Sequence, residues 1–267
     1  MAGNLLKLNR SNYLICQATC PAFERREGRY IVRFARTHAE FDAAAKLRFE
    51  VFNLELGEGL ATSFQTGRDR DEFDETCHHL LVLEAETDQV IGTYRMQTSE
   101  MAAHGKGFYS AGEFDLSSFP ANVLNNAVEL GRACVAQSHR NTAVLFLLWR
   151  GLAAYLLHSR KRYLFGCCSL TSQDTREGWR ALELLKEQGH LHPQLFVPPR
   201  PGFECAADDK DIAQAPEAKI PRLFRTYLRY GAQVCSPPAI DRQFKTIDFL
   251  VLFDVAEMDQ ETAKLFF

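Results

Sequence analysis

A glutamate and an arginine interrupt an apolar stretch near the middle of the chain, residues 127–135 (AVELGRACV). A fully buried strand is normally a near-continuous run of apolar residues. An ionised carboxylate inside such a strand is costly unless it is paired or takes part in chemistry. Glu129 is therefore a candidate general base that takes a proton from an attacking amine, directly or through water. The alternative is a structural ion pair with Arg132 or Arg95.

More charged residues fall on or beside elements that should form the core. Arg48, Arg95 and Arg132 lie on three separate apolar elements, and buried arginines normally have partners. An acidic loop supplies candidate partners: Asp69, Asp71, Glu72, Asp74 and Glu75. Two interpretations stay open for this set, an internal ionic cluster and a pocket for an amino acid. The loop could also be a solvated segment or hold a metal, although it lacks EF-hand spacing.

Three further groups are weaker candidates for chemistry. Cys134 with His139 could form a thiol nucleophile, but no second partner is evident and Cys134 continues an apolar strand. His78 and His79 have no evident third metal ligand. The junction at residues 136–143 (AQSHRNTA) precedes a helix whose N-terminus could bind an anion. Without a Gly-rich loop it suits a single phosphate, held by Ser138 or Arg140, better than a pyrophosphate.

Composition narrows the class of protein. The chain has 267 residues with 46% hydrophobic and 24% charged residues, as in ordinary globular domains. Its net charge of −3 argues against a nucleic-acid-binding protein. The eight cysteines include no C-x-x-C pair, which favours buried thiols in a reducing cytoplasm. We expect no permanently bound cofactor, no metal, no secretory signal and no uninterrupted apolar stretch long enough to span a membrane.

The hydrophobic patterns predict the elements that must position these residues. We expect a leader at residues 1–28, then a single α/β (α+β) domain at 29–267 with a mixed sheet. Thr37 and Glu40 predict a capping box at the start of a helix. The remaining expected elements are a hairpin at 79–96, strands at 126–136, 163–170 and 248–255, helices at 139–160, 174–189 and 222–230, and a loop excursion near 193–219.

Several sequence blocks resemble one known family. The blocks LRFEVF (47–52), DEFDETCHHLLV (71–82), GTYRM (92–96), ELGRACV (129–135) and YLRYGAQVCSPPAIDRQFKTIDFLVLFD (227–254) are similar to the GNAT-like long-chain N-acyltransferases known as ornithine-lipid synthases, often labelled "hemolysin". The same skeleton is similar to the acyl-homoserine-lactone synthases. The resemblance implies a GNAT-type acyl-CoA N-acyltransferase fold, a mixed central sheet with splayed strands flanked by helices.

The resemblance also implies an activity and roles for particular residues. It implies transfer of a long acyl chain from acyl carrier protein, or from coenzyme A, to the α-amine of an amino acid. Ornithine is the family default; glycine, lysine and others stay open. Glu129 matches the proposed base, and Arg48, Asp71, Asp74, Arg95 and Arg132 match the polar cluster, in which Asp71 or Asp74 could hold a second ammonium. The expected donor contacts are Ala133, Cys134, Val135, Ser138 and Arg140.

One departure and two rival functions accompany this interpretation. Ser138 and His139 stand where the family pattern has Pro or Gly, which affects the expected phosphate contact. The rivals are a signal synthase that makes a lactone and a non-catalytic module that binds acyl carrier protein or acyl chains. We expect a cytoplasmic enzyme. Two interpretations stay open for RLFRTYLRY (222–230): packing of its Leu and Tyr on the sheet, which is favoured, and contact with the inner membrane face.

Overall fold

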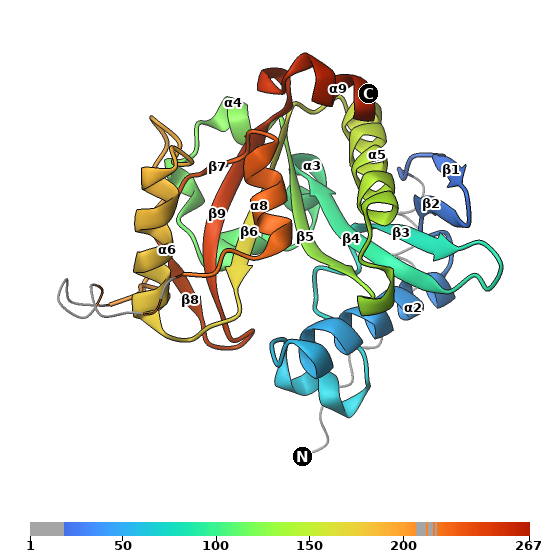
Figure 1. Cartoon of the computed structure of the whole chain (residues 1–267), viewed down its shortest axis with the longest axis horizontal. Coiled ribbons are helices and arrows are strands. Elements are labelled where there is room, and N and C mark those ends of the chain that lie inside the picture. Colours follow the sequence, from blue (N-terminus) through green and yellow to red (C-terminus); the bar gives the residue numbers. More distant parts are fainter. Residues whose placement is uncertain (1–18, 207–211, 213–215, 217) are drawn as a thin grey trace.

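A mixed sheet of nine strands runs through the residues that the computed structural model describes, 19–206, 212, 216 and 218–267 (Figure 1). The strand order is β1-β2-β3-β4-β5-β6-β9-β7, and β8 pairs with β9. All neighbours are antiparallel except β5 and β6. The strands are β1 (Glu24–Glu27), β2 (Tyr30–Phe34), β3 (His78–Glu84), β4 (Val90–Thr98), β5 (Ala127–Val135), β6 (Tyr163–Leu170), β7 (Gln233–Val234), β8 (Ala239–Asp241) and β9 (Thr246–Asp254).

Helices cover both faces of the sheet (Figure 1). They are α2 (His38–Phe49, prolonged by a π-helical turn at Glu50–Glu55), α3 (Ser99–His104), α4 (Ala121–Leu124), α5 (Thr142–Ser159), α6 (Thr175–Glu187), α8 (Arg222–Arg229) and α9 (Gln260–Phe266). Shorter 3₁₀ turns lie at Ala61–Gln65, Tyr109–Gly112, Leu116–Ser118, Gln137–His139 and Val255–Glu257.

The side-chain alternation along β9 shows how the two faces differ. Phe249 and Val251 join one large apolar cluster that includes residues of α5, α6, α8 and α9. Leu250 and Leu252 join a second cluster on the opposite face, with Phe114 and other residues of the 108–124 segment. A third cluster packs α2 against β3, β4 and β5. Asp248, next to Phe249, therefore faces the same side as the 108–124 segment.

Local sequence signals explain several boundaries. The Thr37 side chain accepts from the Glu40 amide and the Glu40 side chain accepts from the Thr37 amide, so the predicted capping box is confirmed. Helix α5 begins at Thr142 rather than at residue 139, because Gln137–His139 forms a 3₁₀ turn and Asn141 is the N-cap. One expectation needs correction, because residues 24–27 of the expected leader form an edge strand paired with β2. Residues 1–18 of that leader lie outside the described part of the chain.

Helix α5 is also the most membrane-like helix among the described residues. Among the described residues it is long and apolar enough to cross a membrane by length and composition, although Arg150 interrupts its apolar run. Half of it is buried in the protein, however, and Val144, Leu147 and Leu148 are fully covered by the core. Its apolar character is accounted for by packing against β2, β3 and β4.

Candidate active site

The site begins where two parallel strands separate. β5 and β6 pair only over Ala127–Glu129 and Tyr163–Phe165. Beyond that point β5 stays bonded to β4, and β6 stays bonded to β9 along its whole length. Gly166 lies at the crossing, where a β-carbon would overlap the Leu130 carbonyl oxygen. The divergence opens a mostly apolar cavity of about 440 Å³ between the strands, α5 and α8.

A β-bulge shapes the wall of this cleft. Thr93 pairs with Cys134 and Arg95 with Gly131, so one residue of β4 faces two residues of β5, Arg132 and Ala133. Arg132 has a φ of +50°, in the left-handed region. The extra residue of a bulge lacks a ladder partner. Arg132 and Ala133 line the cleft and stand outside the register pairs of β4 and β5. The amides of this segment are therefore candidates for polarising a bound carbonyl.

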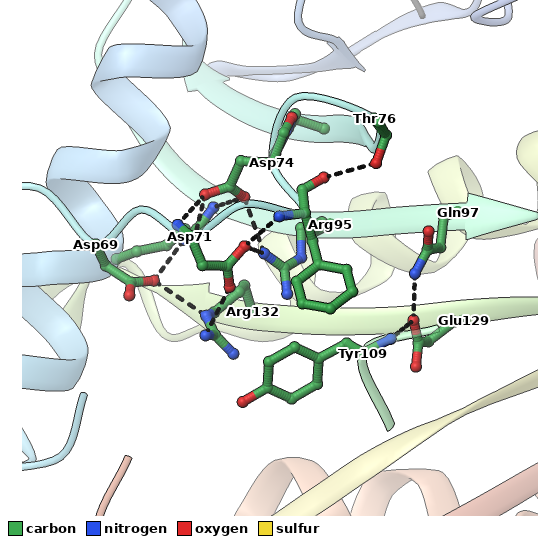
Figure 2. A network of polar contacts seen from close by, with 12 residues as sticks. Asp69, Asp71, Asp74, Thr76, Arg95, Gln97, Tyr109, Glu129 and Arg132 are labelled. Atoms are coloured by element: carbon green, nitrogen blue, oxygen red, sulfur yellow. Dashed lines mark hydrogen bonds and ion pairs between the residues drawn. The ribbon is translucent and has the colours of Figure 1, made fainter. Parts of the chain in front are cut away.

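Glu129 sits at the last paired position of β5, at the apex of the divergence (Figure 2). Its carboxylate is buried and accepts three hydrogen bonds: from Gln97 Nε2 (2.6 Å), from the Tyr109 amide (2.9 Å) and from the Ser110 amide (2.7 Å). No ion pair joins it to Arg95, Arg132 or another cation of the described residues. The alternative of a structural ion pair is therefore excluded. Glu129 lies behind the cleft wall rather than on it.

The predicted polar cluster exists as a closed network of three arginines and three aspartates (Figure 2). Arg48 donates to Asp69 (2.7 Å) and to both oxygens of Asp74 (2.8 and 3.1 Å). Arg95 donates to Asp71 (2.5 Å) and Asp74 (3.0 Å). Arg132 contacts Asp69 (3.2 Å) and Asp71 (2.9 Å). Asp69, absent from the cluster that the resemblance implied, is a full member.

The network is electrically balanced and almost fully buried. Burial alone would raise the pKa of Asp74, but Arg48 and Arg95 beside it hold that pKa well below its usual range. Arg132 also stacks on the rings of Tyr109 (4.8 Å) and Phe244 (4.4 Å). Of the six residues only Arg132 lines the cleft. Asp71 and Asp74 already have arginine partners, so the geometry favours positioning of the cleft wall over contact with a substrate.

The residues expected to contact the donor are divided by the structure. Ala133, Cys134, Val135 and Arg140 line the cleft, whereas Ser138 does not. Arg140 forms a two-point ion pair with Glu55 (2.6 and 2.7 Å) and also donates to the Val135 carbonyl (3.1 Å). One arginine already paired with a glutamate is a poor match for a pyrophosphate and its several charges.

The thiol and histidine candidates have structural surroundings. Burial raises the pKa of the Cys134 thiol to about 12, which leaves almost no thiolate at neutral pH. His78 Nδ1 lies 2.8 Å from the Tyr155 hydroxyl, and His79 Nε2 lies 3.1 Å from the Asp74 carbonyl. Burial lowers the pKa of His79 to about 4, so its ring is neutral. These contacts account for both histidines without a metal.

Buried acids that the sequence patterns did not single out form another part of the site. Glu58 lines the cleft, and Thr171 Oγ1 donates to it. Burial raises the pKa of Glu58 to about 7, with Asp248 adding to the effect. Glu113, Asp241 and Asp248 converge nearby from three segments. The sequence offered one signal, the spacing of Asp241 and Asp248 by seven positions in the 227–254 block. That spacing does not reveal that the two acids meet Glu113.

A central sheet that splays around an apolar cleft, with a bulge on one wall, defines a GNAT-type acyltransferase. Residues 47–150 match the family model described as acetyltransferase (GNAT) domain. The crystal structure of the AHL synthase LasI superposes with a TM-score of 0.50 at 12% identity, covering 90% of this chain and 96% of that one. That likeness supports the fold alone.

Similarity to characterised sequences is more specific. An L-ornithine N(alpha)-acyltransferase of Rhodobacter capsulatus is 33% identical over 242 residues, 87% of this chain and 92% of the relative. Another, of Agrobacterium fabrum, is 32% identical over 244 residues, 87% of this chain and 83% of the relative. The chain belongs to the family of the L-ornithine N(alpha)-acyltransferases and is an N-acyltransferase.

Proposed function

We propose that this enzyme transfers a long-chain acyl group from the thioester of acyl carrier protein to the α-amine of L-ornithine. The carrying observation is the mostly apolar cleft of about 440 Å³ at the β5–β6 divergence, which residues of α5 and α8 help to line. The names of the relatives supply the acceptor. Acyl-homoserine-lactone synthesis remains the rival within the fold, and a binding module without turnover remains the rival outside it.

The donor side of the cleft favours acyl carrier protein over coenzyme A. Coenzyme A carries a pyrophosphate and a further phosphate, which need several cations or a Gly-rich loop. At the start of α5 the described residues offer Arg140, already paired with Glu55, and the free amides of one helix N-terminus. That set suits the single phosphate of a pantetheine arm, whose remaining contacts come from the carrier protein itself.

The reaction is a direct attack without an acyl-enzyme. The neutral α-amine adds to the thioester carbonyl, the C–S bond breaks, and the amine proton and the thiolate leave separately. Amides of the β5 bulge stabilise the charge on the carbonyl oxygen. Glu129 accepts the proton through a water, because it is a buried carboxylate with no cationic partner at the apex of the cleft. Glu58 is the competing acceptor, because it lines the cleft and its pKa is raised to about 7.

Single substitutions separate these two acids. Glu129→Gln should lower kcat by about 10²- to 10⁴-fold if Glu129 is the base. Gln97→Leu is the matched control, since it removes the same hydrogen bond while leaving the carboxylate in place. Equal losses in both variants would mean that Glu129 only positions the Tyr109–Ser110 segment. A large loss in Glu58→Gln together with near wild-type Glu129→Gln would move the role to Glu58.

Product analysis tests the function as a whole. The purified enzyme is given a long-chain acyl donor, on acyl carrier protein or on coenzyme A, together with L-ornithine. We expect Nα-acylornithine by tandem mass spectrometry, and a higher kcat/KM with the carrier protein. A lactone product would establish the signal-synthase rival, and binding without thioester loss would establish the non-catalytic one.

Contact with the cytoplasmic face of the membrane is part of the proposal. Leu228 of α8 is buried in the core, and Tyr227 and Tyr230 pack against it, as the packing interpretation expected. Arg222, Arg225 and Arg229 are exposed on the same helix and are spaced along one face. Such a basic face attracts anionic lipid. Arg222 also lines the cleft, so only Arg225 and Arg229 are reversed in the test. Reversing these two charges should abolish co-sedimentation with phosphatidylglycerol vesicles and leave activity on a detergent-dispersed donor unchanged.

A further inference from the structure

Three buried carboxylates meet beside the cleft from separate parts of the chain. Glu113 follows the 3₁₀ turn at Tyr109–Gly112, Asp241 ends β8, and Asp248 lies on β9. One oxygen of each carboxylate lies within 4.8 Å of the others. The residues are 4%, 6% and 3% exposed, respectively. Asp248 lines the cleft directly.

This acidic triad differs from the Arg–Asp network in having no cation. In the network each aspartate contacts two arginines. In the part of the chain that the structure describes, no lysine or arginine forms an ion pair with Glu113, Asp241 or Asp248. Arg132 acts on Glu113 only from beyond ion-pair distance. Buried carboxylates without a countercharge are costly, so a retained triad of this kind needs an external partner or protons.

The hydrogen bonds leave one acceptor atom of the triad without a donor. Asp241 Oδ1 accepts from the amides of Gln243 (2.7 Å) and Phe244 (2.8 Å), which holds this carboxylate in place. Thr246 Oγ1 donates to Asp248 Oδ2 (2.9 Å). Asp248 Oδ1 is buried and has no donor in hydrogen-bonding geometry within the described chain. Because Asp248 lines the cleft, this buried acceptor without a donor is suited to a ligand that donates.

The raised pKa values of the triad also favour a cationic ligand. Burial raises the pKa of Glu113, and the nearby Asp248 and Asp241 raise it further. Burial also raises the pKa of Asp248, and Asp241 adds to the effect although the Ser169 and Thr246 hydroxyls oppose it. An empty triad therefore retains protons, and a cation that enters it releases them.

We propose that Glu113, Asp241 and Asp248 form the pocket that binds the side-chain ammonium of the acceptor diamino acid. This inference rests on the proposed function, because it assumes that the acceptor has a second amine. An ammonium group has three N–H donors and no acceptor, which matches three carboxylates. Because the three carboxylate oxygens all lie within 4.8 Å of one another, one ammonium can reach each of them with charge-assisted bonds.

The pocket also lies on a suitable side of the cleft. Asp248 faces the side of the sheet covered by the 108–124 segment, opposite the large cluster of α5 and α8. The start of α5 and Arg140 are the candidate contacts for the phosphate of the donor. Acceptor and donor would therefore approach the divergence of β5 and β6 from opposite faces, and their reacting atoms would meet between the strands.

The experiment compares L-ornithine with L-norvaline, which is the same amino acid without the side-chain amine. The wild-type enzyme should prefer ornithine in kcat/KM. Asp248→Asn and Glu113→Gln should reduce that preference by about 10- to 150-fold, the range for a lost hydrogen bond to a charged group. Most of the change should fall on KM for ornithine. Glu261→Gln, at an exposed site on α9, is the control and should keep the wild-type preference.

Each other outcome has a definite meaning. An unchanged preference in both pocket variants, or an equal loss for both acceptors, would overturn the inference while ornithine acylation stands. Loss of wild-type activity in EDTA with recovery in Mg²⁺ or Ca²⁺ would assign the triad to a metal and also overturn it. If the wild-type enzyme acylates neither acceptor, the proposed function fails. Calorimetric titration then still tests the pocket, since ornithine should bind at least about tenfold tighter than norvaline, and equal binding would overturn it.

Discussion

The strongest quantitative prediction concerns Glu58, the cleft-lining acid whose pKa is raised by burial. Its pKa rises from 4.5 to about 7 on folding, with Asp248 adding to the effect and the Thr171 hydroxyl opposing it. A raised carboxyl pKa means that the folded state binds the proton more tightly than the unfolded state. The stability contributed by Glu58 is therefore fully present below about pH 4.5 and is lost as the pH rises through about 7.

The size of the effect follows from the two pKa values. Their difference corresponds to about 3 kcal/mol of unfolding free energy once Glu58 is fully ionised in both states. Between about pH 5 and pH 8 the linkage relation predicts a loss of about 2.5 kcal/mol from this group. Glu58→Gln has no proton to lose, so the mutant should become more stable than the wild type as the pH rises through this window.

Equilibrium unfolding in urea at several pH values measures the effect directly. The quantity of interest is the difference in unfolding free energy between Glu58→Gln and the wild type, because other titrating groups cancel in it. Thr171→Val is the control, since it removes the hydroxyl that opposes the pKa rise and should shift the wild-type dependence to higher pH. A difference that stays constant from about pH 5 to pH 8 would refute the assignment of a raised pKa to Glu58.

Further predictions test other parts of the structure. Asp74→Asn strands Arg48 and Arg95 in the core and should lower the unfolding free energy by about 3–5 kcal/mol, measured in guanidinium; a change below about 1 kcal/mol would contradict a buried network. Asp248→Asn relieves repulsion with Asp241 and should raise the melting temperature, whereas a fall would argue against an uncompensated triad. Gly166→Ala places a β-carbon against the Leu130 carbonyl and should lower the melting temperature sharply in circular dichroism. Cys134→Ala should keep the wild-type kcat, and a loss of turnover would support Cys134 as a catalytic nucleophile.

The periodic parts of the fold could be predicted from the sequence because their signals are local. The capping box at Thr37, the apolar run of α5 and the alternation of the strands each depend on neighbouring residues. The parts that differ depend on tertiary contacts. The polar residues 24–27 become a strand only by pairing with β2, and the two- and three-residue strands β7 and β8 exist only beside β9.

The candidate site was partly predictable for the same reason. The arginines and aspartates of the network stand within recognisable blocks, so their grouping could be expected from a resemblance. Glu113 and Asp248 are 135 positions apart and belong to a loop and a strand. Only the pairing of β6 with β9 and the packing of the 108–124 segment on them bring these acids together. Secondary-structure propensity and residue spacing are local properties, so they do not predict a contact between residues so far apart in the sequence.

The short contact between β5 and β6 has a consequence for the dynamics of the chain. Three register pairs join the two strands, while each strand is bonded along most of its length to its other neighbour. We therefore expect the sheet to unfold as two units, β1–β5 and β6–β9, that meet at this short contact. Local opening at this contact should expose amides of residues 127–129 to hydrogen exchange before those of β3 or β9. An acyl donor lodged between the units would bridge them, and its binding energy would slow the exchange of both halves together.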